Sequence, residues 1–327
     1  MPGSDRGEEH VIVADTEQPG RLLEQVREAL SPDAMPSTLT ALKHPADLDA
    51  HLASRATTLL APPDLAASLL AKLPALRWVQ STFAGVAPIV AAMRTHPNPT
   101  LLLTAAKGMF GPRMAEYVFG WVLGLERRVL DYEALKQSAT WQRLPWRDLG
   151  GRTMTLLGTG SIGTHLAGVA RGFGLRVRGV SRRGRPVEGI DDVLPIAALP
   201  EALAETDYLV ASVPDTPQTR GLLDAAALAH LPPEAIVINV GRGSLIVEDD
   251  LVAALNAGRL RAAVLDVFTQ EPLPADHPFW RTEHLHLTPH IAAFTPEDAI
   301  ARLFADNLGR RRRGERLVGE VDPAAGY

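Results

Sequence analysis

Cysteine is absent from this 327-residue chain. Disulfide bonds, metal sites built on thiolates and catalysis by a cysteine nucleophile are therefore excluded. The absence says little about the compartment in which the protein works. Any chemistry that the chain performs must rest on other side chains or on a cofactor.

Long apolar runs are also missing. No stretch is long enough to span a membrane, and residues 1–10 are polar and charged, unlike the apolar centre of a signal peptide. We therefore expect a loose leader over residues 1–10, no membrane partner and a cytoplasmic location. The net charge of −5 gives no general attraction to nucleic acid, so we expect no nucleic-acid partner either.

Apolar segments of two kinds alternate along the chain. Short runs typical of buried strands are followed by stretches with the helical period, such as residues 21–30. This alternation predicts parallel sheets with helices on both faces, in an α/β fold of Rossmann-like or flavodoxin-like domains. The chain is long enough for two such domains. Strands are predicted at 11–14, 57–61, 77–80 and 100–104, a helix at 113–137, and six further strands at 153–157, 176–181, 208–213, 235–240, 262–268 and 284–288.

Three glycines directly follow the apolar run Met154 to Leu157. Gly158, Gly160 and Gly163 have the G-x-G-x-x-G spacing, and a helical pattern begins within them. The first glycine suits a tight turn, the second lets a pyrophosphate approach the backbone, and the third lets the helix pack closely on the strand. This context predicts a dinucleotide site, with the helix N-terminus at Ser161 and Ile162 facing the phosphates. The alternative is a glycine-rich turn with no ligand.

The next predicted strand ends at Ser181, 18 residues after Gly163 (181 − 163), and Arg182 and Arg183 follow it. A site specific for NAD usually has a carboxylate near this position, where it binds the ribose 2′-hydroxyl. Here a hydroxyl and two guanidinium groups are suited to a 2′-phosphate instead. We therefore predict NADP(H) as the cofactor, with NAD as the weaker one. A solvated basic turn is the alternative interpretation.

Three side chains follow predicted strands of the second half. These are Arg242, Glu271 and His290. In an open parallel sheet, ligands bind beyond the carboxyl ends of the strands, so all three belong to the right layer. Reduction of a 2-keto acid needs a cation for the carboxylate and carbonyl, an acid for the forming alkoxide, and a carboxylate that keeps this acid protonated. Arg242, His290 and Glu271 suit these roles in that order, although Arg242 and Glu271 also suit solvated turns.

Three further features have more than one interpretation on pattern alone. His290 stands close to His284 and His286, but no nearby carboxylate has ligand spacing to them, so we expect no metal. The small residues of Ser81–Val86 join a strand to a helix and expose backbone N–H groups that suit a carboxylate, or they form an ordinary turn. The segment Trp141–Trp146 suits an interface with a partner, or packing on its own chain.

Four segments are similar, in order, to the signature motifs of the D-2-hydroxyacid dehydrogenase family. The resemblance covers the chain from about residue 113 onward. It is strongest to the members that reduce glyoxylate and hydroxypyruvate, on residues 114–117, 131–136, 181–183 and 319–327. The four motif segments are Gly158–Gly163, Asn239–Gly243, Leu265–Leu273 and Thr288–Ala292.

The resemblance implies a role for each matching position. Arg242 would bind substrate, His290 would be the acid/base group, and Glu271 would be its partner. The backbone of Ala84 and Gly85 would hold the substrate carboxylate, next to Phe83, which stands where smaller residues are common. Asp266 would contact the nicotinamide carboxamide side. The implied cofactor site comprises Gly158, Gly160, Ser161, Ile162, Gly163, Ser181, Arg182, Arg183, Val213, Pro214, Val240, Asp266 and His290.

The resemblance also implies a split fold and a homodimer. The cofactor domain, residues 100–290, would be inserted into a substrate domain formed by residues 1–99 and 291–327. The partner contact would run through the cofactor domains, with the Trp141–Trp146 segment reaching toward the second copy. The hypothesis is an NADPH-dependent reductase of a small 2-keto acid such as glyoxylate or hydroxypyruvate. The alternatives are an enzyme for a larger 2-keto or 2-hydroxy acid, and a non-catalytic protein that senses a dinucleotide.

Overall fold

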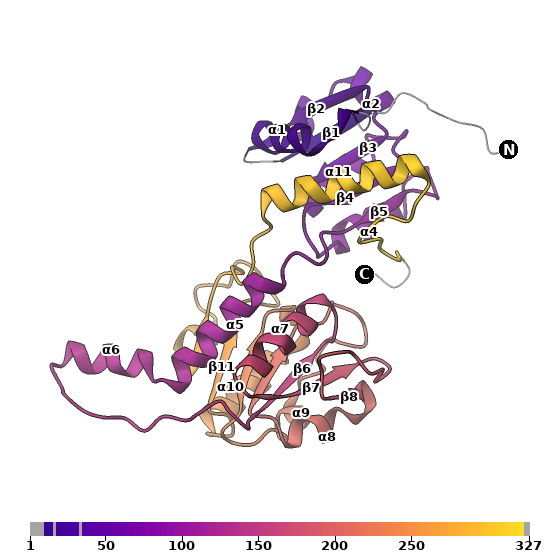
Figure 1. Cartoon of the computed structure of the whole chain (residues 1–327). Helices are drawn as coiled ribbons and strands as arrows, with labels where there is room; N and C mark the ends of the chain where they lie inside the picture. The colour runs from indigo at the N-terminus through magenta and orange to yellow at the C-terminus, as the bar shows by residue number, and fades with distance from the viewer. Residues whose placement is uncertain (1–9, 16–17, 33–34, 324–327) are drawn as a thin grey trace. The chain divides into compact units, whose positions relative to one another are not determined.

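A computed structural model describes residues 10–15, 18–32 and 35–323 (Figure 1). The chain forms two compact units, one made of Met1–Met109 with Thr295–Tyr327 and the other of Phe110–Phe294. All but the last residue of the predicted leader lies outside the described residues, and His10 begins the first strand. Among the residues that the structure describes, no helix combines the length and apolar character needed to cross a membrane.

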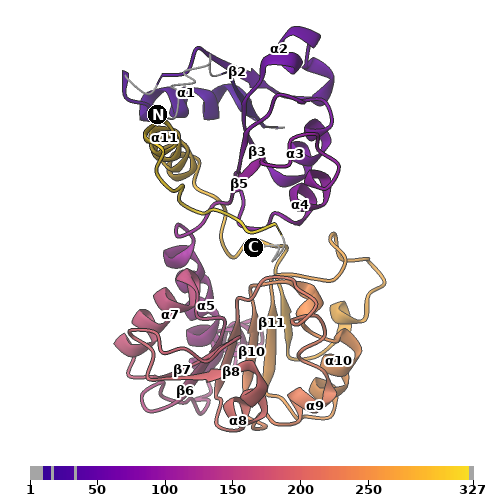
Figure 2. The same cartoon turned by 90° about the vertical axis from the view of Figure 1, so that its right-hand side faces the viewer.

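The first unit is built on a parallel sheet of five strands. Their order is β2-β1-β3-β4-β5, which is the flavodoxin-like order. Helices α1 and α11 pack together on one face, and α3 and α4 pack together on the other (Figure 2). The strands are β1 (His10–Ala14), β2 (Thr38–Leu42), β3 (Thr58–Ala61), β4 (Trp78–Ser81) and β5 (Leu102–Thr104); the helices are α1 (Pro19–Ala29), α2 (Ala50–Arg55), α3 (Pro63–Leu70), α4 (Ala87–Met93) and α11 (Glu297–Arg313), with a short 3-10 turn at Pro45–Asp47.

Buried polar contacts fix the return of α11 to this sheet. The side chain of Asn307 is fully buried and donates to Gln80 Oε1 at 3.0 Å. Phe304 stacks on Trp78 of β4 with 5.0 Å between ring centroids. Beyond the helix, the N–H of Val321 donates to Leu103, so the C-terminal segment covers the free edge of β5. The last helix therefore completes the first unit.

The second unit contains a parallel sheet of seven strands. Their order is β12-β11-β10-β9-β6-β7-β8. Counted from β6, six of the strands have the doubly wound 3-2-1-4-5-6 order of a dinucleotide fold, and β12 extends the sheet at one edge. The prediction of two parallel-sheet α/β domains is confirmed. The strands are β6 (Thr153–Leu157), β7 (Arg176–Ser181), β8 (Asp192–Pro195), β9 (Tyr208–Ala211), β10 (Ile236–Asn239), β11 (Ala262–Leu265) and β12 (Leu285–Leu287).

Helices cover both faces of the second sheet and enclose two apolar cores (Figure 2). The core on one face lies under α5 and α7, and the other lies under α8, α9 and α10. These helices are α5 (Gly111–Glu126), α7 (Ser161–Gly172), α8 (Leu199–Ala204), α9 (Ala225–Leu228) and α10 (Glu248–Asn256), with 3-10 turns at Ile196–Ala198, Gly243–Leu245 and Pro278–Arg281.

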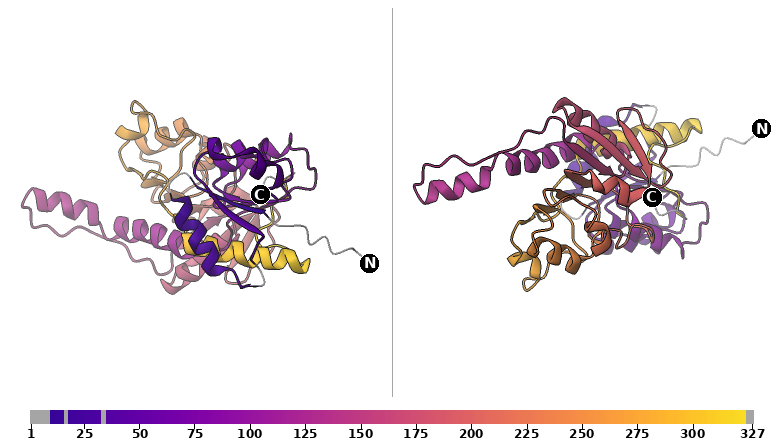
Figure 3. Two further views of the ribbon diagram at one scale, coloured as in Figure 1. Left: turned by 90° about the horizontal axis from the view of Figure 1, so that it is seen from above. Right: turned by 90° about the horizontal axis from the view of Figure 1, so that it is seen from below.

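An arm extends from the body of the second unit (Figures 1 and 3). It consists of α6 (Val129–Gln137) and the irregular segment that follows it to residue 148. The single helix predicted over 113–137 is wrong, because Arg128 adopts a φ of +58° and separates α5 from α6. No residue of α6 is buried, so this helix has no buried apolar stripe. The apolar pattern of the sequence therefore gave no sign of the break between α5 and α6.

The structure also departs from the sequence-based prediction in two edge strands and in the two boundaries between the units. Strands β2 and β8 were not predicted; both lie at a sheet edge and consist mainly of exposed and partly exposed residues, so they lack a buried apolar run. The boundary expected at residue 100 falls at 110, because β5 pairs with β4 and so belongs to the first sheet. The return to the first unit begins at 295, where 291 was expected.

Candidate active site

The glycine turn after β6 is shaped by close backbone contacts. Gly158 has a φ of +108°, and a Cβ on Gly163 would lie 2.1 Å from the carbonyl oxygen of Gly158. Neither position accommodates a side chain. At Gly160, by contrast, an added Cβ would meet no atom within 4 Å. Gly160 is the N-cap of α7, so the open space lies where Ser161 and Ile162 begin the helix with free N–H groups.

A basic turn follows β7. Ser181, the last residue of the strand, accepts a hydrogen bond from the N–H of Gly184 at 3.2 Å through its hydroxyl. Arg182 and Arg183 are both exposed. Within the described part of the chain, neither guanidinium forms a hydrogen bond or an ion pair. The turn therefore presents two positive charges that no group among the described residues neutralises.

The remaining predicted cofactor residues of the central strands lie at the same sheet edge. Val213 and Pro214 follow β9, and Val240 follows β10. The N–H of Val240 donates to Ala211, which continues the ladder between the two strands. At Gly241, an added Cβ would lie 3.0 Å from the carbonyl oxygen of Val213, so these two strand ends lie close together.

Arg242 lies in a turn whose backbone is hydrogen-bonded to the side chain of Asn239. The Asn239 amide donates to the carbonyl of Arg242 at 2.9 Å and accepts from the N–H of Gly241 at 3.1 Å. The turn passes so close to Phe268 that a Cβ on Gly243 would lie 1.9 Å from its carbonyl carbon. The backbone on either side of Arg242 is therefore fixed.

The guanidinium of Arg242 is half-buried and donates to the carbonyl of Gly241 at 2.6 Å. Burial lowers its pKa, and the charges of Glu271 and Asp215 oppose that shift. Two carboxylates therefore act on one partly desolvated cation. Such a cation is suited to bind an anionic substrate group.

His290 and Glu271 form a hydrogen-bonded pair. The Nδ1 atom of His290 lies 2.7 Å from Oε2 of Glu271. The other carboxylate oxygen of Glu271 accepts from the N–H of Phe268 at 2.9 Å, which orients the carboxylate. The imidazole is about half exposed, at 53%. With Nδ1 engaged, the Nε2 atom of the ring is left for another partner.

Asp266 has a contact set that sequence reasoning missed. Its side chain is 1% exposed, and its carboxylate accepts from the hydroxyl of Thr288 and from the N–H groups of Ile291 and Ala292. The N–H of His290 donates to the carbonyl of Asp266 at 2.9 Å. The predicted contact with the nicotinamide stays a prediction; what the structure describes is an anchor for the loop that carries His290.

The predicted substrate loop belongs to the first unit, at the carboxyl end of β4. Phe83 is 47% exposed, and its N–H donates to the hydroxyl of Ser81 at 3.1 Å. Over the described ranges, the N–H groups of Ala84 and Gly85 donate to no protein acceptor. These two donors are available to a ligand.

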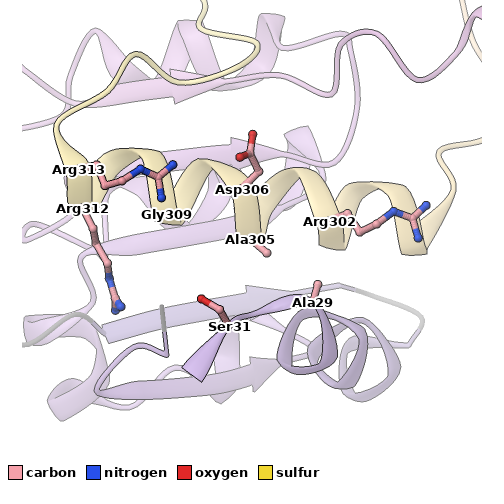
Figure 4. Close-up of a pocket in the computed structure, with 8 residues that line it drawn as sticks. All are labelled: Ala29, Ser31, Arg302, Ala305, Asp306, Gly309, Arg312 and Arg313. Carbon is pink, nitrogen blue, oxygen red and sulfur yellow. The ribbon is translucent and has the colours of Figure 1, made fainter. Parts of the chain in front are cut away.

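Neither a metal site nor a second acid–base site stands out among the described residues. In the described residues, no group of three or more histidine, aspartate and glutamate side chains is placed to hold a metal ion. A cavity of about 490 Å³ lies in the first unit between α1 and α11 (Figure 4). Two of its arginines are neutralised, Arg302 by Asp298 and Arg313 by Glu315. The cavity holds no acid–base pair comparable to His290 and Glu271.

The comparison with known families matches the second unit. Residues 119–292, more than half of the chain, match the family described as "D-isomer specific 2-hydroxyacid dehydrogenase, NAD binding domain". The chain belongs to the D-isomer specific 2-hydroxyacid dehydrogenase family. It is thus an oxidoreductase of that family, and the resemblance noted in the sequence is confirmed.

Several relatives of the family are similar over most of their length. A glyoxylate/hydroxypyruvate reductase A from Klebsiella pneumoniae (strain 342) is 39% identical over 77% of this chain and 82% of that protein. A family member from Aeromonas salmonicida has a crystal structure with a TM-score of 0.87 and 38% identity, covering 97% of this chain and 100% of that one. The NADPH-dependent glyoxylate/hydroxypyruvate reductase of Sinorhizobium meliloti, solved with NADP and sulfate, has a TM-score of 0.85 and 30% identity, covering 98% and 100%.

Proposed function

We propose that this dehydrogenase reduces a small 2-keto acid, of the glyoxylate or hydroxypyruvate kind, to the D-2-hydroxy acid with NADPH. The observation that carries the proposal is the 2.7 Å contact between His290 and Glu271. It joins an acid–base group to a carboxylate at the strand edge where Arg242 also stands. The names of the Klebsiella and Sinorhizobium relatives point to the same substrates.

The cofactor assignment rests on the glycine turn and on the basic turn. The open space at Gly160, next to the start of α7, suits a pyrophosphate. The exposed guanidinium groups of Arg182 and Arg183, with the hydroxyl of Ser181, suit a 2′-phosphate. The NADP bound in the Sinorhizobium relative supports NADP(H) as the preferred cofactor. NAD would bind more weakly, since it lacks the 2′-phosphate.

The chemistry divides among three side chains. Arg242 would bind the substrate carboxylate and polarise the keto oxygen, because its charge is partly desolvated. Bound NADPH supplies a hydride to the keto carbon. His290, as imidazolium, would give a proton from Nε2 to the oxygen, so that hydride and proton together form the alcohol. Glu271 stabilises the charged imidazole through Nδ1 and fixes the ring's orientation.

For the substrate loop of the first unit we propose a role in binding a carboxylate. The N–H groups of Ala84 and Gly85 donate to no acceptor within the described residues and suit such a group, and the exposed ring of Phe83 stands beside them. In this division of roles, Phe110–Phe294 is the cofactor domain and the remaining unit is the substrate domain.

The arm supports a homodimer. Trp141 is fully exposed, and Val129 and Leu130 of α6 are each 50% exposed. Exposed apolar side chains of this kind are typical of a protein–protein interface. Trp146 is held on its own chain, with Arg127 4.0 Å above its ring. Replacing Trp141 and Leu130 together by serine should shift the protein from dimer to monomer in sedimentation. A dimer of unchanged stability would contradict the role of the arm.

The test of the reaction is the initial rate with glyoxylate and with hydroxypyruvate, each with NADPH and with NADH. Turnover with a strong preference for NADPH is the expected result. Turnover with NADH alone would contradict the roles of Arg182 and Arg183 but not the reaction. Failure on both acids and on a panel of bulkier 2-keto acids, with NADPH still bound, would overturn the reaction and favour a dinucleotide sensor.

A further inference from the structure

The carboxylate of Asp266 is the centre around which the loop 288–292 is folded. Its Oδ1 atom accepts from Thr288 Oγ1 at 2.6 Å and from the N–H of Ile291 at 2.8 Å, and Oδ2 accepts from the N–H of Ala292 at 2.9 Å. His290 lies between these donors in sequence. The loop therefore wraps the buried carboxylate and presents the imidazole outward, toward Glu271.

His290 occupies a backbone conformation that the loop must enforce. Its φ is +55°, in the left-handed region that residues with a Cβ rarely adopt. Such a conformation persists only where surrounding contacts over-determine it. Here its N–H donates to the carbonyls of Asp266 and Thr288. Loosening these contacts would release the backbone of His290 and turn its ring away from Glu271.

Tyr117 extends this set of contacts, because it is hydrogen-bonded to Thr288, which in turn contacts Asp266. The hydroxyl of Tyr117, on α5, lies 2.5 Å from the hydroxyl of Thr288. Thr288 has a single hydroxyl hydrogen, and it goes to Asp266, because an ionised carboxylate can only accept. Tyr117 must therefore donate to Thr288. Burial of the phenol, together with the nearby charge of Asp266, raises the pKa of Tyr117 to about 12. The phenol keeps its proton throughout the neutral range.

We propose that Tyr117 is a positioning residue for the reaction, acting through Thr288 and Asp266 to hold the loop that carries His290. The inference rests on the proposed function, since it gives Tyr117 a part in the placement of the acid. Tyr117 is 173 residues away from His290 in the sequence (290 − 117). A shift of the acid by about 1 Å is enough to slow a reaction about a hundredfold.

Three substitutions test the chain of hydroxyl groups. Tyr117→Phe removes only the phenol oxygen, Thr288→Val removes only the threonine hydroxyl at nearly constant shape, and Thr288→Ser keeps that hydroxyl. We expect kcat to fall about tenfold or more in the first two variants, with little change in the Kd for NADPH. Thr288→Ser should restore most of the rate. The double variant Tyr117→Phe with Thr288→Val should be no slower than Thr288→Val alone, because both remove the same link.

A matched control separates this role from loss of stability. Thr206 is buried and its hydroxyl donates to Ala202 at 2.8 Å, before the start of β9 at the opposite edge of the sheet. Thr206→Val should lower the unfolding midpoint by a similar amount and leave kcat unchanged. If Thr206→Val slows the reaction as much as Thr288→Val does, the effect is one of stability and the proposal is wrong.

A measurement that does not depend on catalytic activity can test the positioning role of Tyr117 independently of the proposed reaction. The imidazole NMR signals of His290, assigned by their loss in His290→Ala, should move in Tyr117→Phe and Thr288→Val and stay in place in Thr288→Ser. Unmoved signals in the first two variants would overturn the positioning role, whatever the substrate. A wild-type protein that reduces no 2-keto acid, but whose His290 signals respond as expected, would refute the reaction alone.

Discussion

His290 Nδ1 and Glu271 Oε2 are 2.7 Å apart, and Phe268 holds the second oxygen of that glutamate. The two residues lie 19 positions apart in the sequence. Glu271 is in the loop after β11 and His290 is in the loop after β12, two strands of the same sheet. The geometry directs Nδ1 toward Glu271 and leaves Nε2 for another partner. We therefore expect the two residues to act as one unit in the proposed reaction.

We first predict non-additive losses for this pair. His290→Ala should reduce kcat about a thousandfold, within the usual range for a general acid, with the Kd for NADPH changed less than about twofold. Glu271→Gln should by itself produce most of that fall in kcat, because the neutral amide no longer stabilises the imidazolium. The double variant should be close to His290→Ala. Additive losses in steady-state kinetics would show that the residues act independently.

A second prediction concerns the choice of cofactor. Replacing both Arg182 and Arg183 by glutamine should weaken NADPH binding by at least about a hundredfold, since each lost charge-assisted bond is worth about 1.5–3 kcal/mol. The Kd for NADH should change little. Arg185→Gln, an exposed arginine of the same turn region, is the matched control. Equal weakening of the two cofactors, measured by fluorescence titration, would contradict the assignment of the 2′-phosphate site.

The glycines of the turn after β6 should separate folding from binding. Gly163→Ala places a Cβ 2.1 Å from the backbone of Gly158, so it should lower the free energy of unfolding by several kcal/mol, on the order of 3. Gly160→Ala meets no protein atom and should fold normally, yet raise the Kd for NADPH at least tenfold. Normal NADPH affinity in Gly160→Ala would place the pyrophosphate elsewhere.

A fourth prediction concerns stability against acid. Glu126 is 1% exposed and pairs with Arg147 and Arg261, at 2.7 and 2.8 Å. Burial opposes the shift, but the bonds from Arg147, Arg261 and Tyr208 lower the pKa of Glu126 to about 2 from an ordinary 4.5. A lowered pKa contributes stability above pH 4.5 that is lost as the pH falls toward 2.

Glu126→Gln should therefore be less stable at pH 7, by about 3 kcal/mol, because two partly buried arginines lose their shared carboxylate. Between pH 4.5 and 2, its stability should fall less steeply than that of the wild type. Urea unfolding at several pH values gives both quantities. The exposed Glu283→Gln serves as the control. A parallel pH dependence in Glu126→Gln and the wild type would remove Glu126 as a source of acid sensitivity.

Local pattern was sufficient for most of the fold and for placing the candidate site residues after strands. The strand–glycine–helix arrangement around Gly158 is encoded within ten residues, because turn geometry and helix start depend on neighbours in sequence. The positions of Arg242, Glu271 and His290 after strands were likewise readable, since all parallel strands of a sheet end at one edge. Strands β2 and β8 were not readable, because an exposed edge strand needs no apolar pattern.

The sequence by itself determined two parallel α/β sheets, the dinucleotide turn and the types of residue at the strand ends. The tertiary structure alone decided how these residues are held. Asp266 supports the His290 loop, Tyr117 lies behind it, and Asn307 returns α11 to the first sheet. The physical reason is that each of these contacts joins residues far apart in the chain. Local spacing carries no record of such a contact, because its partner is brought close only when the sheet and its helices have packed.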